Sequence, residues 1–234
     1  MSPAPSERLI VALDVEGPDQ ARELIAKIGD NAGVWKIGLE LLFAGGAELT
    51  RELSDQGKKV FVDAKLLDIP NTVERAAANI AAMGAAFLTV HGHDIKTMEA
   101  AIKGRGSSDM KLLAVTVLTS LDKSDLEQQG SNMTPAELVL HRARLRREAG
   151  FDGVIASGHE AASIREATGD DFLIITPGIR PAGADVGDQA RVMTPAKAIG
   201  AGADYLVVGR PITQAPDPCA AACAIVEEIE QALV

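Results

Sequence analysis

The stretch Val60-Phe61-Val62-Asp63-Ala64-Lys65-Leu66-Leu67-Asp68-Ile69-Pro70-Asn71-Thr72 joins an apolar strand, a group of charges and the start of a helix. β-Branched and aromatic residues at 60–62 are typical of a buried strand. Pro70 and Asn71 mark a turn, and the Ala-rich segment after them predicts a helix. This order of strand, turn and helix is one βα unit, and the rest of the chain repeats it.

Two carboxylates and an ammonium stand at the end of this strand. Asp63 and Lys65 are two residues apart, so on a strand they point to the same face. An ion pair there could be purely structural, because charges beside an apolar strand need a partner. Asp68 makes the group a mixed-charge cluster, and such clusters shift pKa values and suit proton transfer. The spacing alone leaves both interpretations open.

Strand and helix patterns alternate along the whole chain. The other apolar runs predict strands at residues 9–14, 34–39, 87–92, 111–118, 153–157, 172–176 and 205–209. Helical patterns are expected near residues 20–28, 41–56, 72–83, 95–103, 135–149, 160–167 and 218–232, with a longer loop after residue 118. Continuously apolar strands indicate a parallel sheet that is buried on both faces.

No linker or change of composition divides the chain, and its 234 residues suit one barrel. We therefore expect an α/β fold, a single-domain (β/α)8 TIM barrel over residues 1–234. A doubly wound open sheet is the alternative, which is less favoured because no Gly-x-Gly-x-x-Gly follows the first strand.

Composition limits the partners of this chain. Its formal net charge of −10 argues against nucleic acid and anionic membranes. The N-terminal segment has no basic region followed by an apolar one, and no apolar run is long enough to cross a bilayer. We expect a cytoplasmic protein whose anionic ligands, if any, bind in a local basic pocket.

Charged and polar residues gather where the predicted strands end. In a barrel these ends share one mouth, which holds the active site. The residues in these positions are Asp14, Lys36, Asp63, Lys65, His91, Thr119, Ser120 and Arg210.

Two segments have the composition of phosphate-binding loops. Residues 176–180 (Thr-Pro-Gly-Ile-Arg) and 209–213 (Gly-Arg-Pro-Ile-Thr) follow the seventh and eighth strands, between which barrels often bind phosphate. Glycine lets the backbone approach an anion, and arginine supplies a bidentate donor. The Gly- and Asp-rich residues 181–189 between them are long for a loop, so we expect a lid over the site.

For two other motifs we favour a structural role over a binding site. His91-Gly92-His93 could bind a metal through alternate side chains, but no third ligand is associated with it, so we predict no metal site. The basic residues 142–147 on a predicted helix are expected to form a solvated face.

The residues quoted above resemble, as a set, the orotidine 5′-phosphate decarboxylase family. Residues 63–72 are similar to its signature, in which Asp-x-Lys-x-x-Asp is shared with a wider superfamily and Ile-Pro-Asn-Thr narrows the match. Further matching segments follow in the family's order over nearly the full length: residues 12–14, 36–38, 117–120, 176–180, 187–189 and 208–213. One departure is the sequence His91-Gly92-His93.

The resemblance implies roles for individual residues. Lys65 would be the proton donor in an alternating network with Lys36, Asp63 and Asp68, the last supplied by the partner subunit of a homodimer. Ile69 and Thr72 would also cross that interface. The remaining implied substrate contacts are Asp14 and Lys36 for the ribose, Thr119 with Ser120 for the pyrimidine, and Arg180, Gln189, Gly209 and Arg210 for the phosphate. Pro177 is a further expected substrate contact.

The resemblance also implies a reaction without metal or other cofactor. Orotidine 5′-phosphate would lose CO₂ to give uridine 5′-phosphate, the last step of pyrimidine nucleotide synthesis, through a C6 carbanion that Lys65 protonates. Two other hypotheses remain open. One is a magnesium-dependent enzyme of the same superfamily that acts on sugar phosphates. Lys36 argues against it, because the resemblance implies an acidic metal ligand at this position in those enzymes. The other is a barrel that senses a phosphorylated ligand without turnover.

Overall fold

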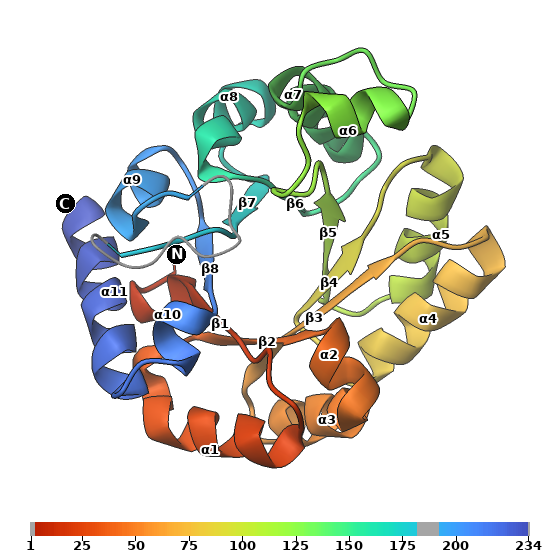
Figure 1. The fold of residues 1–234 in the computed structure, drawn as a ribbon. Helices are drawn as coiled ribbons and strands as arrows, with labels where there is room; N and C mark the ends of the chain where they lie inside the picture. The colour runs from red at the N-terminus through yellow and green to blue at the C-terminus, as the bar shows by residue number, and fades with distance from the viewer. Residues whose placement is uncertain (1–2, 182–191, 234) are drawn as a thin grey trace.

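The structure, a computed structural model, describes residues 3–181 and 192–233. Within them, eight parallel strands pair in chain order, and β8 pairs with β1 to close a barrel (Figure 1). The strands are β1 (Leu9–Ala12), β2 (Val34–Gly38), β3 (Lys59–Leu66), β4 (Phe87–Val90), β5 (Lys111–Val115), β6 (Gly153–Ile155), β7 (Leu173–Thr176) and β8 (Tyr205–Val208). The predicted (β/α)8 barrel is confirmed, and the open sheet is wrong.

Helices surround the barrel and cover the outer faces of its strands (Figure 1). The α-helices are α1 (Pro18–Ile28), α2 (Leu39–Leu41), α3 (Ala47–Asp55), α4 (Pro70–Ala82), α5 (Ile95–Arg105), α6 (Lys123–Gln128), α7 (Pro135–Glu148), α8 (Gly158–Thr168), α9 (Pro195–Gly200), α10 (Arg210–Thr213) and α11 (Pro218–Ala232). Shorter turns are the 3-10 helices η1 (Ser6–Arg8) and η2 (Gly29–Asn31) and the π-helix η3 (Leu42–Gly46).

Proline and capping residues set the start of several helices. Pro70, Pro135 and Pro218 each occupy the first helical position, where the missing N–H is not needed. The Thr134 and Asp217 side chains accept hydrogen bonds from first-turn backbone N–H groups of α7 and α11. These local signals explain why the two helices begin at the residues that the sequence indicated.

The helix expected over residues 41–56 is broken. Gly45 has φ +110° and Ala44 is also non-helical, so α2, the π-turn η3 and α3 replace one continuous helix. A left-handed φ is easy for glycine and expensive for other residues. Because the apolar pattern continues across residues 44 and 45, the sequence did not predict this break in the helix.

Three further differences lie in the loops. The loop after β5 contains α6, which starts with a capping box between Asp122 and Asp125. Helices α9 and α10, which were not predicted, follow β7 and β8. Strand β5 ends at Val115 rather than near residue 118, so Thr116 starts the loop that leads to the mouth.

Alternation along the strands divides the barrel interior from the helix layer. One buried cluster comprises Ile10, Val34, Phe61, Phe87, Leu113 and Ile175. The Phe61 and Phe87 rings meet edge to face at 6.0 Å. Ala12 and Lys36 lie two residues beyond Ile10 and Val34 and therefore point to the same side. The interior cluster thus forms the floor beneath the side chains at the mouth.

Candidate active site

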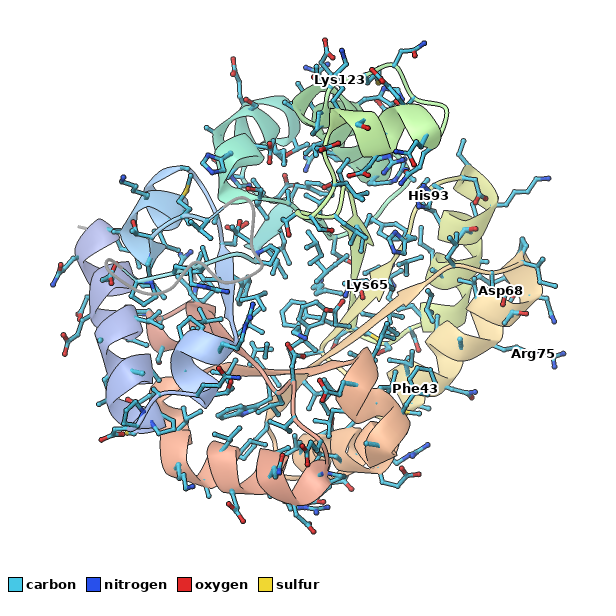
Figure 2. All side chains as sticks on the ribbon, viewed as in Figure 1. Phe43, Lys65, Asp68, Arg75, His93 and Lys123 are labelled. Atoms are coloured by element: carbon cyan, nitrogen blue, oxygen red, sulfur yellow. The ribbon has the colours of Figure 1, made fainter. Side chains whose placement is uncertain are left out.

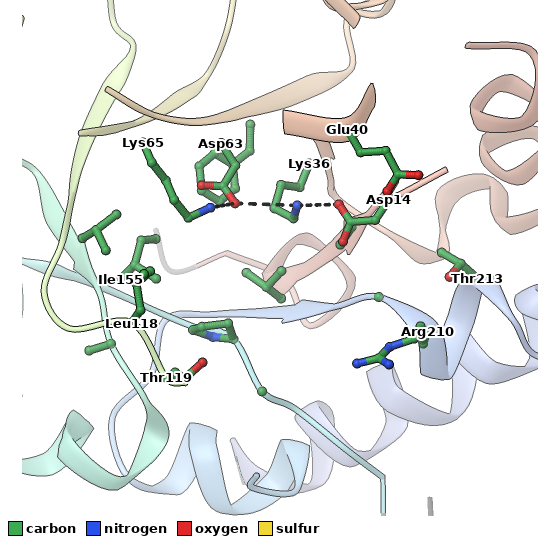
Figure 3. Close-up of a pocket in the computed structure, with 18 of the residues that line it drawn as sticks. Asp14, Lys36, Glu40, Asp63, Lys65, Leu118, Thr119, Ile155, Arg210 and Thr213 are labelled. Carbon is green, nitrogen blue, oxygen red and sulfur yellow. Dashed lines mark hydrogen bonds and ion pairs between the residues drawn. The ribbon is translucent and has the colours of Figure 1, made fainter. Parts of the chain in front are cut away.

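Four side chains at the mouth form a row of alternating charge (Figure 3). Asp63 Oδ2 lies 2.8 Å from Lys65 Nζ and 3.6 Å from Lys36 Nζ. Lys36 Nζ also lies 2.9 Å from Asp14 Oδ1. Lys36 and Asp63, the two inner residues of the row, each have two neighbours of opposite charge. The row therefore stabilises the charged form of each of its members.

Strand register brings these residues together. Lys36 on β2 pairs with Phe61 on β3, and Gly38 pairs with Asp63. Only 7% of Lys36 is exposed, so its charge depends on its two carboxylate partners. A Cβ on Gly38 would lie 2.9 Å from both Asp14 Oδ1 and Lys36 Nζ. The absence of a side chain at Gly38 therefore leaves room for that ion pair.

Lys65 stands on an irregular part of β3. The pairing with β4 shifts between Val62 and Leu66, and Lys65 adopts φ +47°, the only positive φ of a non-glycine residue among those described. A lysine in this region is strained, and such residues gather at functional sites. The register shift and the positive φ thus lie in the segment from which Lys65 Nζ reaches Asp63 Oδ2 at 2.8 Å.

Asp63 is ionised across the ordinary pH range. Burial raises the pKa of its carboxyl, but the Lys36 and Lys65 ammoniums and hydrogen bonds from Lys65 and Thr89 together hold the pKa below its usual range. The carboxylate is therefore a fixed negative charge beside the Lys65 ammonium.

The charge row borders a cavity of about 510 Å³. Besides Asp14, Lys36, Asp63 and Lys65, its lining includes five residues that the sequence put in the site: Thr119, Pro177, Arg180, Gly209 and Arg210. This volume is in the range of small-molecule sites. In Figure 3, Arg210 lies on the opposite side of the cavity from Lys65. The cavity thus has a charge row on one side and a basic group on the other.

Other predicted site residues lie elsewhere. Asp68, Ile69 and Thr72 are exposed and do not line this cavity. Figure 2 shows Lys65 within the ring of strands and Asp68 toward the outside, beside α4. Ser120 lines a neighbouring pocket together with Thr119. Gln189 and the expected lid at 181–189, apart from Pro181, lie outside the described residues.

Three polar residues in or next to the cavity were not identified from the sequence. Glu40 lines the cavity from α2, and Gln214 lines it just after α10. Thr89 is fully buried and hydrogen bonds to both Asp63 and Lys65. Thr89 is the single polar residue in the apolar strand Phe87-Leu88-Thr89-Val90, which was the available signal.

The basic residues of α7 form the expected solvated face only in part, because Arg144 is exposed but Arg142 is half-buried. Arg146 is buried, and its Nε has no hydrogen-bond partner in the described chain. Burial and the neighbouring Arg142 lower the pKa of Arg146 to about 10, although Asp94 opposes the shift. Arg142 donates to the Thr116 carbonyl and lies 3.3 Å from His93 Nδ1. Helix α7 thus turns Arg142 and Arg146 inward and leaves Arg144 exposed, a division that the Arg-rich pattern did not reveal.

The two histidines stack on one another near these arginines. The His91 and His93 rings are 5.2 Å apart and nearly parallel. Burial lowers the pKa of His91, and the positive charges of His93, Lys65 and Arg142 lower it further.

In the described residues no group of three or more His, Cys, Asp or Glu could hold a metal ion. The part of the chain that the structure covers also has no helix long and apolar enough to cross a membrane.

Comparison with known proteins gives the family. A model of the "Orotidine 5′-phosphate decarboxylase / HUMPS family" matches residues 7–225. The chain belongs to this family. The resemblance seen in the sequence is confirmed over nearly the whole chain.

Relatives with the decarboxylase name are similar over full length. An orotidine 5′-phosphate decarboxylase from Rhodopseudomonas palustris (strain BisA53) is 55% identical over 95% of this chain and 94% of its own. One from Methylobacterium nodulans is 53% identical over 99% of both chains. A crystal structure of orotidine 5′-phosphate decarboxylase from Lactobacillus acidophilus has a TM-score of 0.83 and 40% identity, covering 94% of this chain and 98% of its own. These names favour the decarboxylase branch of the family.

Proposed function

We propose that this protein decarboxylates orotidine 5′-phosphate to uridine 5′-phosphate and CO₂ in pyrimidine nucleotide synthesis. The observation that carries the proposal is the row Asp14–Lys36–Asp63–Lys65 beside a cavity, in a chain of this family. Binding alone does not need a positioned proton donor, whereas protonation of a carbanion does, and Lys65 is such a group.

The chemistry assigns Lys65 the central step. When the bond from C6 to the carboxylate breaks, its electron pair stays on C6 and CO₂ leaves. The Lys65 ammonium stabilises the developing negative charge and then gives C6 a proton. Its neutral amine takes a proton back from solvent after product release. Because Asp63 already holds Lys65 at 2.8 Å, little reorganisation is needed.

Asp63 has a second effect on the substrate. Its carboxylate would lie near the departing carboxylate, so their repulsion is relieved as CO₂ forms. The Lys36 and Lys65 ammoniums keep Asp63 charged while the substrate binds. Lys36 therefore acts on the reaction through Asp63 as well as through the substrate.

The remaining site residues expected from the sequence would hold the nucleotide. We assign Asp14 and Lys36 to the ribose hydroxyls, Thr119 and Pro177 to the pyrimidine end together with Ser120 at the rim, and Arg180, Gln189, Arg210 and the Gly209 backbone to the phosphate. The position of Arg210 across the cavity from Lys65 supports this direction of binding (Figure 3). Binding energy from the remote phosphate can then lower the barrier at C6.

A homodimer with shared sites completes the proposal. Asp68, Ile69 and Thr72 would reach the partner's cavity, with Asp68 extending its charge row. Exposed apolar side chains support an interface: Leu67 and Ile69, on either side of Asp68 in the sequence, are 56% and 66% exposed, and Phe43 in η3 is 86% exposed. We also propose that residues 1–234 act as one catalytic domain, and the cytoplasmic location remains a prediction.

The test is the loss of orotidine 5′-phosphate absorbance with wild-type protein, Lys65→Ala and the surface control Lys27→Ala, each with and without a chelator. Wild type and Lys27→Ala should be active regardless of chelator. Lys65→Ala should lose roughly 100- to 10,000-fold in kcat, the usual contribution of general acid catalysis. It should still bind uridine 5′-phosphate.

Three outcomes would overturn the proposal. Unchanged turnover by Lys65→Ala would show that Lys65 is not the proton donor of the reaction. A folded wild type that binds uridine 5′-phosphate without turnover would be a sensor. A folded wild type that acts only on sugar phosphates with magnesium would belong to the other branch of the family.

A further inference from the structure

Thr89 occupies an unusual place between β3 and β4. Val62 pairs with Leu88, and the next pairing is Leu66 with Val90. Asp63, Ala64 and Lys65 on β3 therefore oppose Thr89 alone on β4. A bulge of this kind leaves backbone groups without ladder partners and re-aims side chains.

The Thr89 hydroxyl connects the two charged residues of this bulge. It accepts a hydrogen bond from the Lys65 backbone N–H at 2.9 Å and donates one to Asp63 Oδ1 at 2.8 Å. A hydroxyl has one proton and two lone pairs, so both bonds can exist together. Thr89 is 0% exposed, so water does not compete for these positions.

Each bond constrains a different part of the site. The bond to Lys65 N–H satisfies a backbone donor in the strained conformation with φ +47°. The bond to Oδ1 turns the Asp63 carboxylate so that Oδ2 faces Lys65 Nζ at 2.8 Å and Lys36 Nζ at 3.6 Å. The backbone and the carboxylate are thus fixed by one atom.

We propose that Thr89 is a positioning residue for the reaction, whose hydroxyl holds the bulge that carries Lys65 and orients Asp63 between two ammoniums. This inference rests on the proposed function. Thr89 does not line the cavity, so it acts through Asp63 and Lys65 and not by touching substrate. A uniquely placed hydroxyl predicts that serine can replace threonine and that isosteric valine cannot.

The experiment compares Thr89→Val and Thr89→Ser with Thr50→Val. Thr50 is an equally buried threonine, whose hydroxyl donates to the Gly46 carbonyl on the outer helix layer. Steady-state kcat and KM for orotidine 5′-phosphate, the affinity for uridine 5′-phosphate and the Tm are measured for each variant.

The expected result separates catalysis from binding and stability. Thr89→Val should lose about 10- to 100-fold in kcat, as for a hydrogen bond to a charged group, while KM and product affinity change less than about threefold. Thr89→Ser should stay within about threefold of wild type. Thr50→Val should lower Tm and leave kcat unchanged.

The pH profile gives a readout that a merely structural role would not move. The charged groups around Asp63 are Lys36 on β2, Lys65 on β3 and His91 after β4, and Thr89→Val leaves all three in place. Loss of the hydrogen bond to the ionised carboxylate raises the pKa of Asp63. The acid limb of kcat/KM should therefore move to higher pH in Thr89→Val and not in Thr89→Ser.

The inference fails if Thr89→Val keeps wild-type kcat and pH profile, or if Thr89→Ser is as impaired as Thr89→Val. It also fails if Thr50→Val loses kcat to the same extent. If Thr89→Val does not fold, Thr89→Ala against Thr89→Ser makes the same comparison. An inactive wild type would instead sink the proposed decarboxylase function, so the two failures are distinguishable.

Discussion

Lys36 and Asp14 form an ion pair across the mouths of β1 and β2, with Lys36 Nζ 2.9 Å from Asp14 Oδ1. The same ammonium lies 3.6 Å from Asp63 Oδ2, so Lys36 joins an outer carboxylate to the inner one beside Lys65. Lys36 is buried and Asp14 is largely exposed at its carboxylate. Lys36 Nζ thus lies between the two carboxylates, nearer to Asp14, and its positive charge also stabilises ionised Asp63.

Replacing Lys36 by Met should destabilise the ionised form of Asp63. Without this ammonium the pKa of Asp63 rises, because burial is then opposed by fewer positive charges. We expect kcat/KM to fall by roughly 10-fold or more and its acid limb to move to higher pH. Lys59→Met is the control. Lys59 forms an ion pair with Glu7 at the N-terminal end of β3, which is the opposite end of the strand from the mouth. An acid limb that stays in place would contradict the prediction.

A mixture of two inactive variants tests the shared site. In a heterodimer of Asp68→Ala and Lys65→Ala subunits, one site has both Lys65 and the partner's Asp68 intact. Equal mixing should restore about a quarter of wild-type activity, because half of the dimers are mixed and each has one complete site. Asp63→Ala mixed with Lys65→Ala should stay inactive, since both defects lie in the same subunit's part of the site. No recovery after verified subunit exchange would exclude the shared arrangement.

The stacked histidines should make stability depend on pH. Burial, Arg142 and Arg146 lower the pKa of His93, so the unfolded chain binds a proton more readily than the folded one. The free energy of unfolding should therefore fall as pH decreases from about 7 through the ordinary histidine pKa of about 6.5. In His93→Gln this fall should be smaller between about pH 7 and 5.5. Denaturant titrations measure it, with His141→Gln as an exposed control, and an equal slope in all three proteins would refute the prediction.

The contact between α4 and α5 depends on Gly104. A Cβ at this position would overlap the Glu74 carbonyl oxygen and press on Ala77 Cβ. Because a backbone carbonyl cannot rotate away, Gly104→Ala should push the helices apart and lower the free energy of unfolding by about 1–3 kcal/mol. Gly200→Ala is the control, since nothing lies within 4 Å of its Cβ position. Equal stability of the two variants would show that the interface yields without cost.

The sequence determined the barrel because its strands carry a local signal. Continuous apolar runs such as residues 9–13 and 205–209 have no polar face, which indicates a parallel sheet covered on both sides. Charged residues at the carboxyl ends of such strands, or on the strand just before the end as Lys36 is, are expected to share the mouth. Asp14, Lys36, Asp63 and Lys65 could therefore be assigned to one site before any distance was known.

The tertiary structure decided what depends on contacts between distant residues. The bulge that gives Lys65 its positive φ exists because β3 and β4 pair out of step, and Thr89 became part of the site only through that pairing. Arg146 is buried because α7 turns it toward Gly92, although Arg144, Arg147 and Glu148 around it in the sequence are charged. Local composition reports burial and secondary structure, since these follow from the residue and its period along the chain. Register, strain and the choice of hydrogen-bond partner are properties of two segments together, and they are fixed only when the barrel closes.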